Sequence, residues 1–480
     1  MSTIEYYANG KLHRLAARAP AQLKAPKPAL GAHLKDGAAP RATTAVHAVQ
    51  AQSVRLAPLF HSVAAEAMLI AVPAAGGPAV IPTATLIVEG ANKTELKRLR
   101  EKFGLTVLNE GKEGKVLLRA PDGGAAGIQQ AADAAKAAYE SGKVKAASPN
   151  FLRVVNRIGP SAAAGQRLWN HQNDGNPGVP GADVAARAAW TLTRGVADVR
   201  VAVLDEGVDT THPALQAAVV AEKDFVDGNP TARPDGNDAH GTACAGIIVS
   251  RDATTPGLAS GCSLVAARIA KGDGAGGWVF DDFQTADAID WAWDDAKADV
   301  LSNSWGGGPP VDVITRAFER ARTKGRGGRG AVVAIATGNS NTALQFPSTL
   351  PNVLAVGASN GWDERKSPTS RDGEPWGSCY GKGLSLVAPG VRIATTDIQG
   401  AAGYGSSDFV DGFNGTSSAT PHVAAAAALI LSLAKDLGED AVRNAITASA
   451  DRLTPTGKWD KFVGWGRLNL FTALRLARRL

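Results

Sequence analysis

Five near-continuous apolar runs, beginning at residue 199, restrict the fold of this chain more than any other feature. Each run has the length of a strand, and the stretches between the runs are long enough to hold helices. The runs are residues 199–208, 263–270, 298–306, 330–339 and 352–359. Strands without polar alternation are buried on both faces, as in a parallel sheet covered by helices. The sequence therefore predicts a three-layer α/β fold with a mainly parallel sheet.

The segment upstream of these runs has a different pattern. Between residues 83 and 150, the expected elements follow the order strand, helix, strand, strand, helix, strand, which is the order of a small ferredoxin-like α+β domain. Residues 1–80 are rich in Ala, Pro and basic side chains with little periodicity. We predict four parts. They are a low-complexity leader over 1–80, a small domain over 81–155, a linker over 156–164 and an α/β domain over 165–480.

Composition excludes several classes of protein. The chain has 51 Lys and Arg against 45 Asp and Glu, and the excess is concentrated in the first 50 residues rather than on a predicted domain, so we expect no nucleic-acid partner. The three cysteines, Cys244, Cys262 and Cys379, are too few for a disulfide framework, although one pair remains open. No apolar stretch suggests a membrane span, and no secretory signal is visible at the start, which favours the cytoplasm.

Polar side chains end several of the predicted strands. Asp205, Asn303, Ser304 and Asn339 each lie at the close of an apolar run. Sites in parallel sheets gather beyond the carboxyl ends of the strands, so chemistry is expected among these residues.

Residues 412–431, GFNGTSSATPHVAAAAALIL, predict a buried helix that begins with hydroxyl side chains. Ser417 at such an N-terminus would lie beside free backbone N–H groups, which can hold a developing oxyanion. Pro421 is expected in about the first turn, where its missing N–H costs least. A serine that only caps a core helix is the simpler interpretation of this stretch taken alone.

Two other stretches favour a nucleophile. Asp205 ends a buried strand, and His240 precedes Gly241 and Thr242 at the start of another apolar helix. An Asp, a His and a Ser on one side of an α/β sheet fit the relay that activates a serine, and their order here is Asp205, His240, Ser417.

The segments VLDEGVDTTHP, HGTACAG, ATGNSN and NGTSSATPHVA together resemble the conserved blocks of the subtilisin-like serine proteases, or subtilases. The resemblance runs from about residue 165 to residue 480. It implies a serine endopeptidase that works through Asp205, His240 and Ser417 and an acyl-enzyme intermediate. It also implies that Asn339 and the backbone N–H of Ser417 form the oxyanion hole, whereas His212 and His422 are structural.

The same resemblance implies a substrate groove. Gly274, Ala275 and Gly276 would form an edge strand that pairs with the substrate backbone, and Trp278 would line a hydrophobic subsite. The walls and floor of the main specificity pocket would come from Ser304, Trp305, Gly306, Ala336, Thr337, Gly338 and Gln345. Gly272, Gly274 and Gly277 also match G-x-G-x-x-G, but the following strand does not end in an acid, which disfavours a dinucleotide site.

Subtilases commonly carry a propeptide with the fold expected for residues 81–155. The resemblance therefore implies a self-inhibited zymogen whose linker, 156–164, holds the processing site. Expected partners are a polypeptide substrate and the chain's own propeptide, with a monomeric enzyme and no required cofactor. Ala214 stands where calcium-binding members have an acid, and the stretch from His240 to Gly257 is short, so we predict that the usual strong calcium site is absent; weaker sites stay open.

Two other functions share parts of this pattern. An esterase of the α/β-hydrolase type would need glycine where Ala419 lies and the order Ser, Asp, His. A catalytically silent binding protein of the same fold would keep these residues behind a blocked groove.

Overall fold

The computed structural model describes residues 2–18, 70–73, 79–161, 167–273 and 277–480. The chain divides into two compact units. Unit 1 contains residues 1–157, 272–290 and 307–317, and unit 2 contains residues 158–271, 291–306 and 318–480. The two units are described separately below.

Unit 1 contains the predicted small domain. Its elements follow the predicted order: β4 (Val80–Glu89), α2 (Lys93–Phe103), β5 (Thr106–Glu110), β6 (Lys115–Arg119), α3 (Ala125–Glu140) and β7 (Ala146–Asn156). β4 pairs with β6 and β7, and β6 pairs with β5, all antiparallel. The 3-10 turn η3 (Lys112–Gly114) joins β5 to β6. The Asn92 side chain caps α2 by accepting from the Glu95 N–H, and Gly104 ends it in the left-handed conformation. The ferredoxin-like order of elements is thus confirmed.

The predicted leader is wrong for its first residues. β1 (Ser2–Ala8) and β2 (Lys11–Arg18) form an antiparallel hairpin, and β3 (Ile70–Pro73) connects β2 to β4. Here tertiary packing outweighs composition, because the Tyr6 side chain is buried against Phe151 and the Tyr7 ring stacks on Tyr139 of α3. The remainder of the leader, residues 19–69 and 74–78, lies outside the described residues.

Two later segments of the chain complete unit 1. β12 (Gly277–Asp281) pairs antiparallel with β7, from Gly277 opposite Asn156 to Asp281 opposite Leu152. β12 follows β11 (Ala270–Gly272) and leads into α6 (Asp282–Asp294). The second segment, residues 307–317, includes the first half of α7 (Asp312–Lys324).

Buried charges hold these segments to the small domain. Arg153 of β7 is buried and pairs with the buried Asp282, while its guanidinium also donates to the carbonyls of Gly307 and Pro309. Lys115 of β6 is fully buried and pairs with Asp290 of α6. Each of these cations is compensated by a carboxylate, which burial of a charge requires.

Unit 2 is built on the predicted parallel sheet. Its strands lie in the order β16, β15, β14, β13, β8, β10, β9, and every neighbouring pair is parallel. The strands are β8 (Arg200–Asp205), β9 (Val219–Asp224), β10 (Ser263–Arg268), β13 (Val300–Asn303), β14 (Val332–Ala336), β15 (Leu354–Ser359) and β16 (Leu386–Pro389). The five predicted runs are all strands, so the α/β class is confirmed.

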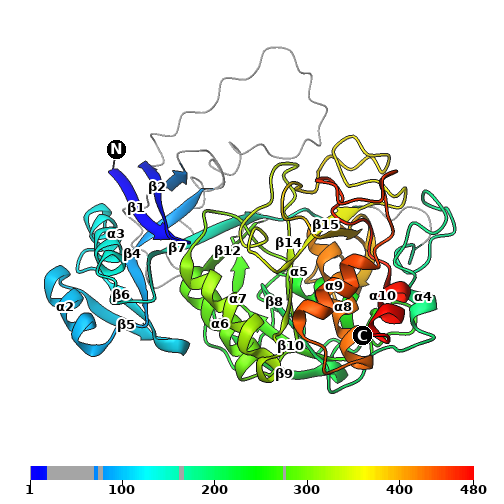
Figure 1. The fold of residues 1–480 in the computed structure, drawn as a ribbon, viewed down its shortest axis with the longest axis horizontal. Helices are drawn as coiled ribbons and strands as arrows, with labels where there is room; N and C mark the ends of the chain where they lie inside the picture. Colours follow the sequence, from blue (N-terminus) through cyan, green and yellow to red (C-terminus); the bar gives the residue numbers. More distant parts are fainter. Residues whose placement is uncertain (1, 19–69, 74–78, 162–166, 274–276) are drawn as a thin grey trace, which may run out of the picture. The chain divides into compact units, whose positions relative to one another are not determined.

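Helix α8 (Thr416–Leu433) lies in the core of unit 2, against β13 to β16 and against α5 (His240–Val249). The residues Ala424–Ala428 are fully buried, and their small side chains let the helix approach the sheet closely. In Figure 1, α8 is drawn in orange beside α9 (Glu439–Ala448) and α10 (Leu470–Ala477). The remaining elements are α4 (Ala186–Ala189), η4 (Gln216–Ala218), η5 (Gly325–Gly328), β17 (Ile393–Thr396) and β18 (Phe409–Phe413).

Among the described helices, only α8 is long and apolar enough to cross a membrane. Of that stretch, 89% is buried inside the protein, which is the behaviour of a core helix.

The Arg153–Asp282 pair generates a prediction about stability. Replacing Arg153 with Met leaves the Asp282 carboxylate buried without its charge partner, so we expect a loss of about 3–5 kcal/mol in the unfolding free energy of unit 1. Arg14→Met is the matched control, because Arg14 pairs with Glu5 at an exposed position and its loss should matter much less. Urea unfolding of the two variants measures the difference. Equal losses would contradict the prediction.

Candidate functional site

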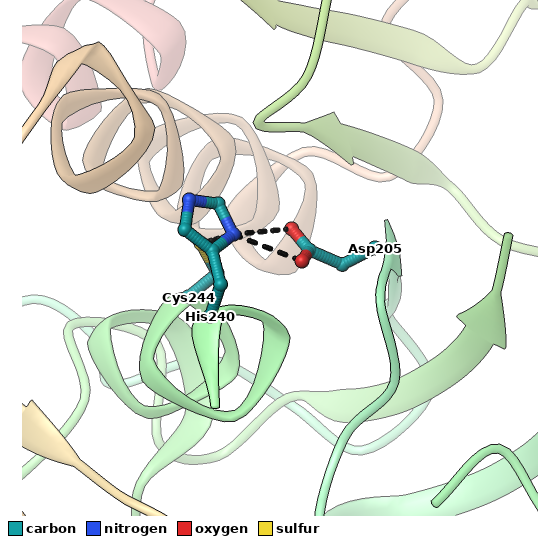
Figure 2. A group of neighbouring side chains, drawn as sticks. All are labelled: Asp205, His240 and Cys244. Atoms are coloured by element: carbon teal, nitrogen blue, oxygen red, sulfur yellow. Dashed lines mark hydrogen bonds and ion pairs between the residues drawn. The ribbon is translucent and has the colours of Figure 1, made fainter. Parts of the chain in front are cut away.

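Asp205 is held at the carboxyl end of β8 in a fully buried position. One of its carboxylate oxygens accepts from the Glu206 N–H at 2.9 Å. Both oxygens face the ring of His240, with Nδ1–oxygen distances of 2.9 and 3.1 Å (Figure 2). The carboxylate therefore fixes the tautomer that carries the proton on Nδ1 and turns Nε2 away from Asp205.

His240 is the first residue of α5, and two groups position its backbone and ring. The Glu206 carboxylate accepts from the His240 backbone N–H at 2.9 Å, and the ring packs edge-to-face on Phe413. Glycine is required at the next position, because a Cβ on Gly241 would lie 2.1 Å from the Gly207 carbonyl oxygen and 2.8 Å from the Asp205 Cβ. Gly241 thus allows the start of α5 to touch the end of β8. This role of Glu206 is visible only in the structure, although its place directly after Asp205 is an available signal in the sequence.

Ser417 lies in the first turn of α8, and Pro421 is the sixth residue of this helix rather than in its first turn. Because proline has no N–H, the Ser417 carbonyl loses its partner within the helix. Ser304 replaces it by donating its hydroxyl to this carbonyl at 2.9 Å, and the Cys244 thiol lies 3.6 Å away. The Ser417 hydroxyl in turn donates to the Ser304 carbonyl at 3.2 Å. The proline therefore ties Ser417 to the end of β13.

Asn339 follows β14 and has a fixed side-chain orientation. Its Oδ1 accepts from both the N–H and the hydroxyl of Thr416, each at 2.9 Å. With the oxygen occupied in this way, the Nδ2 donors face away from Thr416. Asn339 is only half-buried, so a group outside the protein can reach these donors.

Gly415 leaves open the space that the two donors share. A Cβ at this position would lie 3.4 Å from Asn339 Nδ2 and 3.4 Å from the Ser417 backbone N. Both nitrogens therefore border one small volume that only glycine keeps empty, and φ of +118° at Gly415 also favours glycine. An oxygen atom in this volume would receive two hydrogen bonds.

The predicted pocket residues follow β13 and β14, as expected. Ser304 is buried behind Ser417, and Gln345 lies over Gly338 with its backbone N–H donating to the Thr337 carbonyl at 3.0 Å. The Trp305 ring is buried and stacks on Phe318, so a pocket wall at this position would come from the Trp305 backbone. Gly306 lies against the Phe346 carbonyl, and Ala336 ends β14 in a buried position.

The predicted edge strand lies outside the described residues, because Gly274, Ala275 and Gly276 are not described. The adjoining residue Trp278 belongs to β12 in unit 1, where it is buried and paired with Val155 of β7.

The two other candidate histidines have structural contacts. His212 Nδ1 accepts from the Ala214 N–H, and its Nε2 contacts the Asp408 carbonyl at 2.9 Å. His422 lies inside α8, where Nδ1 donates to the Ser418 carbonyl and Nε2 accepts from the Asn170 amide, both at 2.8 Å. Burial lowers the pKa of His422 to about 4, so its ring stays neutral near neutral pH.

All three cysteines are buried and unpaired. Asp205, His240 and Cys244 form the one group of potential metal ligands among the described residues, and their ligand atoms lie within 4.8 Å of one another. Burial raises the pKa of the Cys244 thiol well above its usual value, which keeps it protonated and disfavours metal binding there.

The loop between α5 and β10 bears on the calcium prediction. Arg167 reaches this loop and donates to the Thr254 carbonyl at 3.0 Å and to the Thr255 hydroxyl at 2.7 Å, while also pairing with Asp411. A guanidinium on loop oxygens does not fit a divalent cation bound to those same oxygens. Ala214 is buried and offers only its carbonyl, which accepts from the Arg251 N–H. The donor set thus does not fit calcium at this place.

The predicted linker contacts the segment that precedes α8. The Ser161 N–H donates to the Gly412 carbonyl at 2.9 Å, and the Ser161 hydroxyl accepts from the Asn414 amide at 3.0 Å. Asn414 also reaches the Gly159 carbonyl at 3.4 Å, and the Ile158 side chain packs on the core of unit 2. Residues 158–161 therefore contact the segment from Gly412 to Asn414, which lies a few residues before Ser417 in the sequence.

Comparison with known proteins gives a consistent result. The sequence profile of the subtilase family matches residues 197–466. Thermitase from Thermoactinomyces vulgaris is 33% identical over 297 residues, which cover 61% of this chain and 94% of thermitase. A protein named calcium-dependent protease from Nostoc sp. is 31% identical over 329 residues, which cover 60% of this chain. The match spans 48% of that relative, so the chain covers about half of its length.

Solved structures show the same fold at low identity. Fervidolysin from Fervidobacterium pennivorans, a keratinolytic enzyme related to subtilisin, superposes with a TM-score of 0.64 at 23% identity, over 82% of this chain and 61% of that one. The serine protease of Aeromonas sobria, solved in complex with a chaperone, gives a TM-score of 0.56 at 23% identity, over 68% of each chain.

The buried His422 generates a prediction about pH. Its pKa is about 4 in the fold and 6.5 in the unfolded chain, so the unfolded state binds the proton first as the pH falls. The stability that the neutral ring contributes is complete above about pH 6.5 and is lost as the pH falls toward about 4. In His422→Gln we expect a smaller loss of unfolding free energy across this range than in the unsubstituted chain. Parallel curves for the two proteins, measured by urea unfolding, would refute the assignment.

Proposed function

The chain belongs to the subtilase family of serine endopeptidases, and we propose that it cuts polypeptides through Asp205, His240 and Ser417 as a self-inhibited zymogen. The observation that carries the proposal is the buried contact of Asp205 with His240 Nδ1 at 2.9 and 3.1 Å, at the edge of the sheet where α8 brings Ser417. An Asp–His contact of this kind orients the base that activates a serine hydroxyl.

The first step follows from these contacts. Ser417 Oγ attacks the scissile carbonyl, and its proton passes to His240 Nε2 as the new O–C bond forms. For this step the hydroxyl turns from the Ser304 carbonyl toward the imidazole. Asp205 stabilises the resulting imidazolium by holding its Nδ1 proton. His240 then gives the proton to the leaving amine, the C–N bond breaks and an acyl-enzyme remains, which water hydrolyses by the same route.

The oxyanion of the tetrahedral intermediate would occupy the volume beside Gly415. There it would accept from Asn339 Nδ2 and from the Ser417 backbone N–H, the two donors that border this volume. The Thr416 contacts hold the amide in place before the reaction, so no reorganisation is needed when charge develops.

Two observations support the zymogen part of the proposal. Within unit 1, β7 at the end of the small domain adds to β12 as an antiparallel strand, which is how an extended peptide binds a sheet edge. Within unit 2, residues 158–161 bond to the segment ahead of Ser417. We therefore keep the processing site within 156–164 and the small domain at 81–155 as proposed boundaries.

The proposed enzyme requires no metal for catalysis. We further propose that the Arg167 guanidinium performs the structural task at the α5–β10 loop that a cation performs in calcium-binding members of the family. The hydrogen bonds of Arg167 to Thr254 and Thr255 support this proposal.

A catalytically silent binding protein is the remaining alternative. The accessible donors of Asn339 and the intact Asp205–His240 contact favour an active enzyme. A fluorophosphonate probe separates the two, because only an activated serine is labelled.

The first test concerns the nucleophile. We expect Ser417→Ala to abolish hydrolysis of a peptide substrate and to leave the chain uncut at full length. Ser418→Ala is the matched control: it removes a neighbouring hydroxyl that donates to the Gly415 carbonyl, and it should retain activity and processing. Intact-mass spectrometry and a peptide assay measure both outcomes. Full hydrolysis by the Ser417 variant would end the proposal.

A second test concerns the oxyanion. Asn339→Asp keeps the acceptor for Thr416 and removes the amide donor, so we expect kcat to fall by about 10²–10³ or more with the fold retained. Asn341→Asp, on the same loop, keeps the acceptor for Arg365 and should change kcat little. Similar kcat values for the two variants would show that Asn339 does not hold the oxyanion.

A third test concerns the loop and calcium. We expect EDTA to leave the melting temperature almost unchanged, whereas Arg167→Met lowers the unfolding free energy by about 1 kcal/mol, because its partners are partly exposed. Thermal melts with and without chelator measure both effects. A large drop in melting temperature with EDTA would reveal a structural calcium site and contradict the proposal.

A further inference from the structure

Unit 2 contains a cavity of about 500 Å³ that shares no residue with the site around Ser417. Two arginines, a histidine, a tryptophan and a threonine contribute polar groups to its lining, and a leucine, an alanine and a proline contribute apolar side chains. The lining residues are Leu168, His171, Arg187, Trp190, Thr191, Arg194, Ala253 and Pro256.

The cavity has an uncompensated positive charge. Two buried arginines of unit 2 are matched by acids: Arg268 pairs with Asp224, Asp227 and Asp235, and Arg467 pairs with two carboxylates. Arg187 and Arg194 form no ion pair with any described residue, and no acid is among the residues that line the cavity. Two guanidiniums facing one cavity without a carboxylate create a site for an anion.

His171 adds a second, independent observation. Its side chain is 95% buried, it lines the same cavity, and neither ring nitrogen has a hydrogen-bond partner among the described residues. Neither ring nitrogen is among the fully buried unpartnered atoms of the described residues, so both remain open to a ligand in the cavity. Burial, with His422, Arg187 and Arg194 nearby, lowers the pKa of His171 to about 3. The neutral ring therefore offers one N–H donor.

Trp190 fixes the positions of two of these groups. Its indole N–H donates to the Leu258 carbonyl at 2.8 Å, which holds the ring in place. Arg194 stacks on the ring, with its guanidinium carbon 4.0 Å from the ring centre, and His171 packs on it edge-to-face at 5.2 Å. The guanidinium of Arg194 and the imidazole of His171 are thus positioned before a ligand arrives, which lowers the entropic cost of binding.

We propose that this cavity binds a phosphorylated small molecule. Arg187, Arg194 and the His171 N–H hold the phosphate, since a guanidinium matches phosphate oxygens in a two-point contact. The cavity is larger than phosphate alone, and Leu168, Ala253 and Pro256 receive the apolar part of the ligand. The proposal is independent of peptide hydrolysis and survives if the proposed nucleophile proves wrong.

Isothermal titration of the full chain carrying Ser417→Ala tests the proposal, with inorganic phosphate and phenyl phosphate as probes at constant ionic strength. We expect both to bind at one site, phenyl phosphate more tightly because its ring reaches the apolar side. Arg187→Gln should weaken both probes by about tenfold or more, as expected for loss of a charged hydrogen bond. Arg187 is exposed and unpaired, so this variant should fold normally.

Arg475→Gln is the matched control, because Arg475 is also exposed and also stacks on an aromatic ring, that of Phe471. It should bind both probes as the parent does. Absence of binding in the parent, or equal affinity in Arg187→Gln and the parent, would overturn the proposal. Equal weakening by Arg475→Gln would also overturn it, since the effect would then reflect net charge rather than the cavity.

Discussion

The approach of two helix N-termini to the carboxyl edge of one parallel sheet is the constraint on which the rest of the site depends. Helix α5 can reach the end of β8 only because Gly241 has no side chain, and Gly415 leaves open the small volume that Asn339 Nδ2 and the Ser417 backbone nitrogen border. These two positions bring His240 to Asp205 and place Ser417 beside Asn339. A Cβ at Gly241 would push α5 away from β8, and a Cβ at Gly415 would occupy the volume beside Asn339 and Ser417.

Hydrogen bonds between backbone groups and nearby side chains hold the site together. Pro421 removes one hydrogen bond from α8, and the freed carbonyl of Ser417 becomes the acceptor for Ser304 at the end of β13. A proline that weakens a helix therefore strengthens the connection between helix and sheet. Glu206 acts similarly for α5 by accepting from its first N–H. Backbone groups that would be costly to leave unpaired thus help to position Ser417 and His240.

In unit 1, β7 pairs with β12, and two buried ion pairs join the small domain to the segment that contains β12 and α6. The pairs Arg153–Asp282 and Lys115–Asp290 are buried, so they require good geometry to form at all. The Arg153–Asp282 pair favours one register of β7 on β12 over others. The hairpin β1–β2 enlarges the same sheet and buries Tyr6 against it.

The sequence by itself determined the parallel sheet, the βαββαβ order of the small domain and the family, because periodicity and short blocks are local properties. Four candidate site residues could be identified because each of them ends or begins an apolar element: Asp205, His240, Ser417 and Asn339. The tertiary structure alone decided contacts between distant segments. The composition of the first residues did not indicate the hairpin at Ser2–Arg18. The burial of the Trp305 side chain also depends on tertiary packing, as does the hydrogen bond from Arg167 to a loop carbonyl 87 residues away in the sequence. Arg187 and Arg194 share a cavity only after folding, since neither their spacing nor their neighbours in sequence require it.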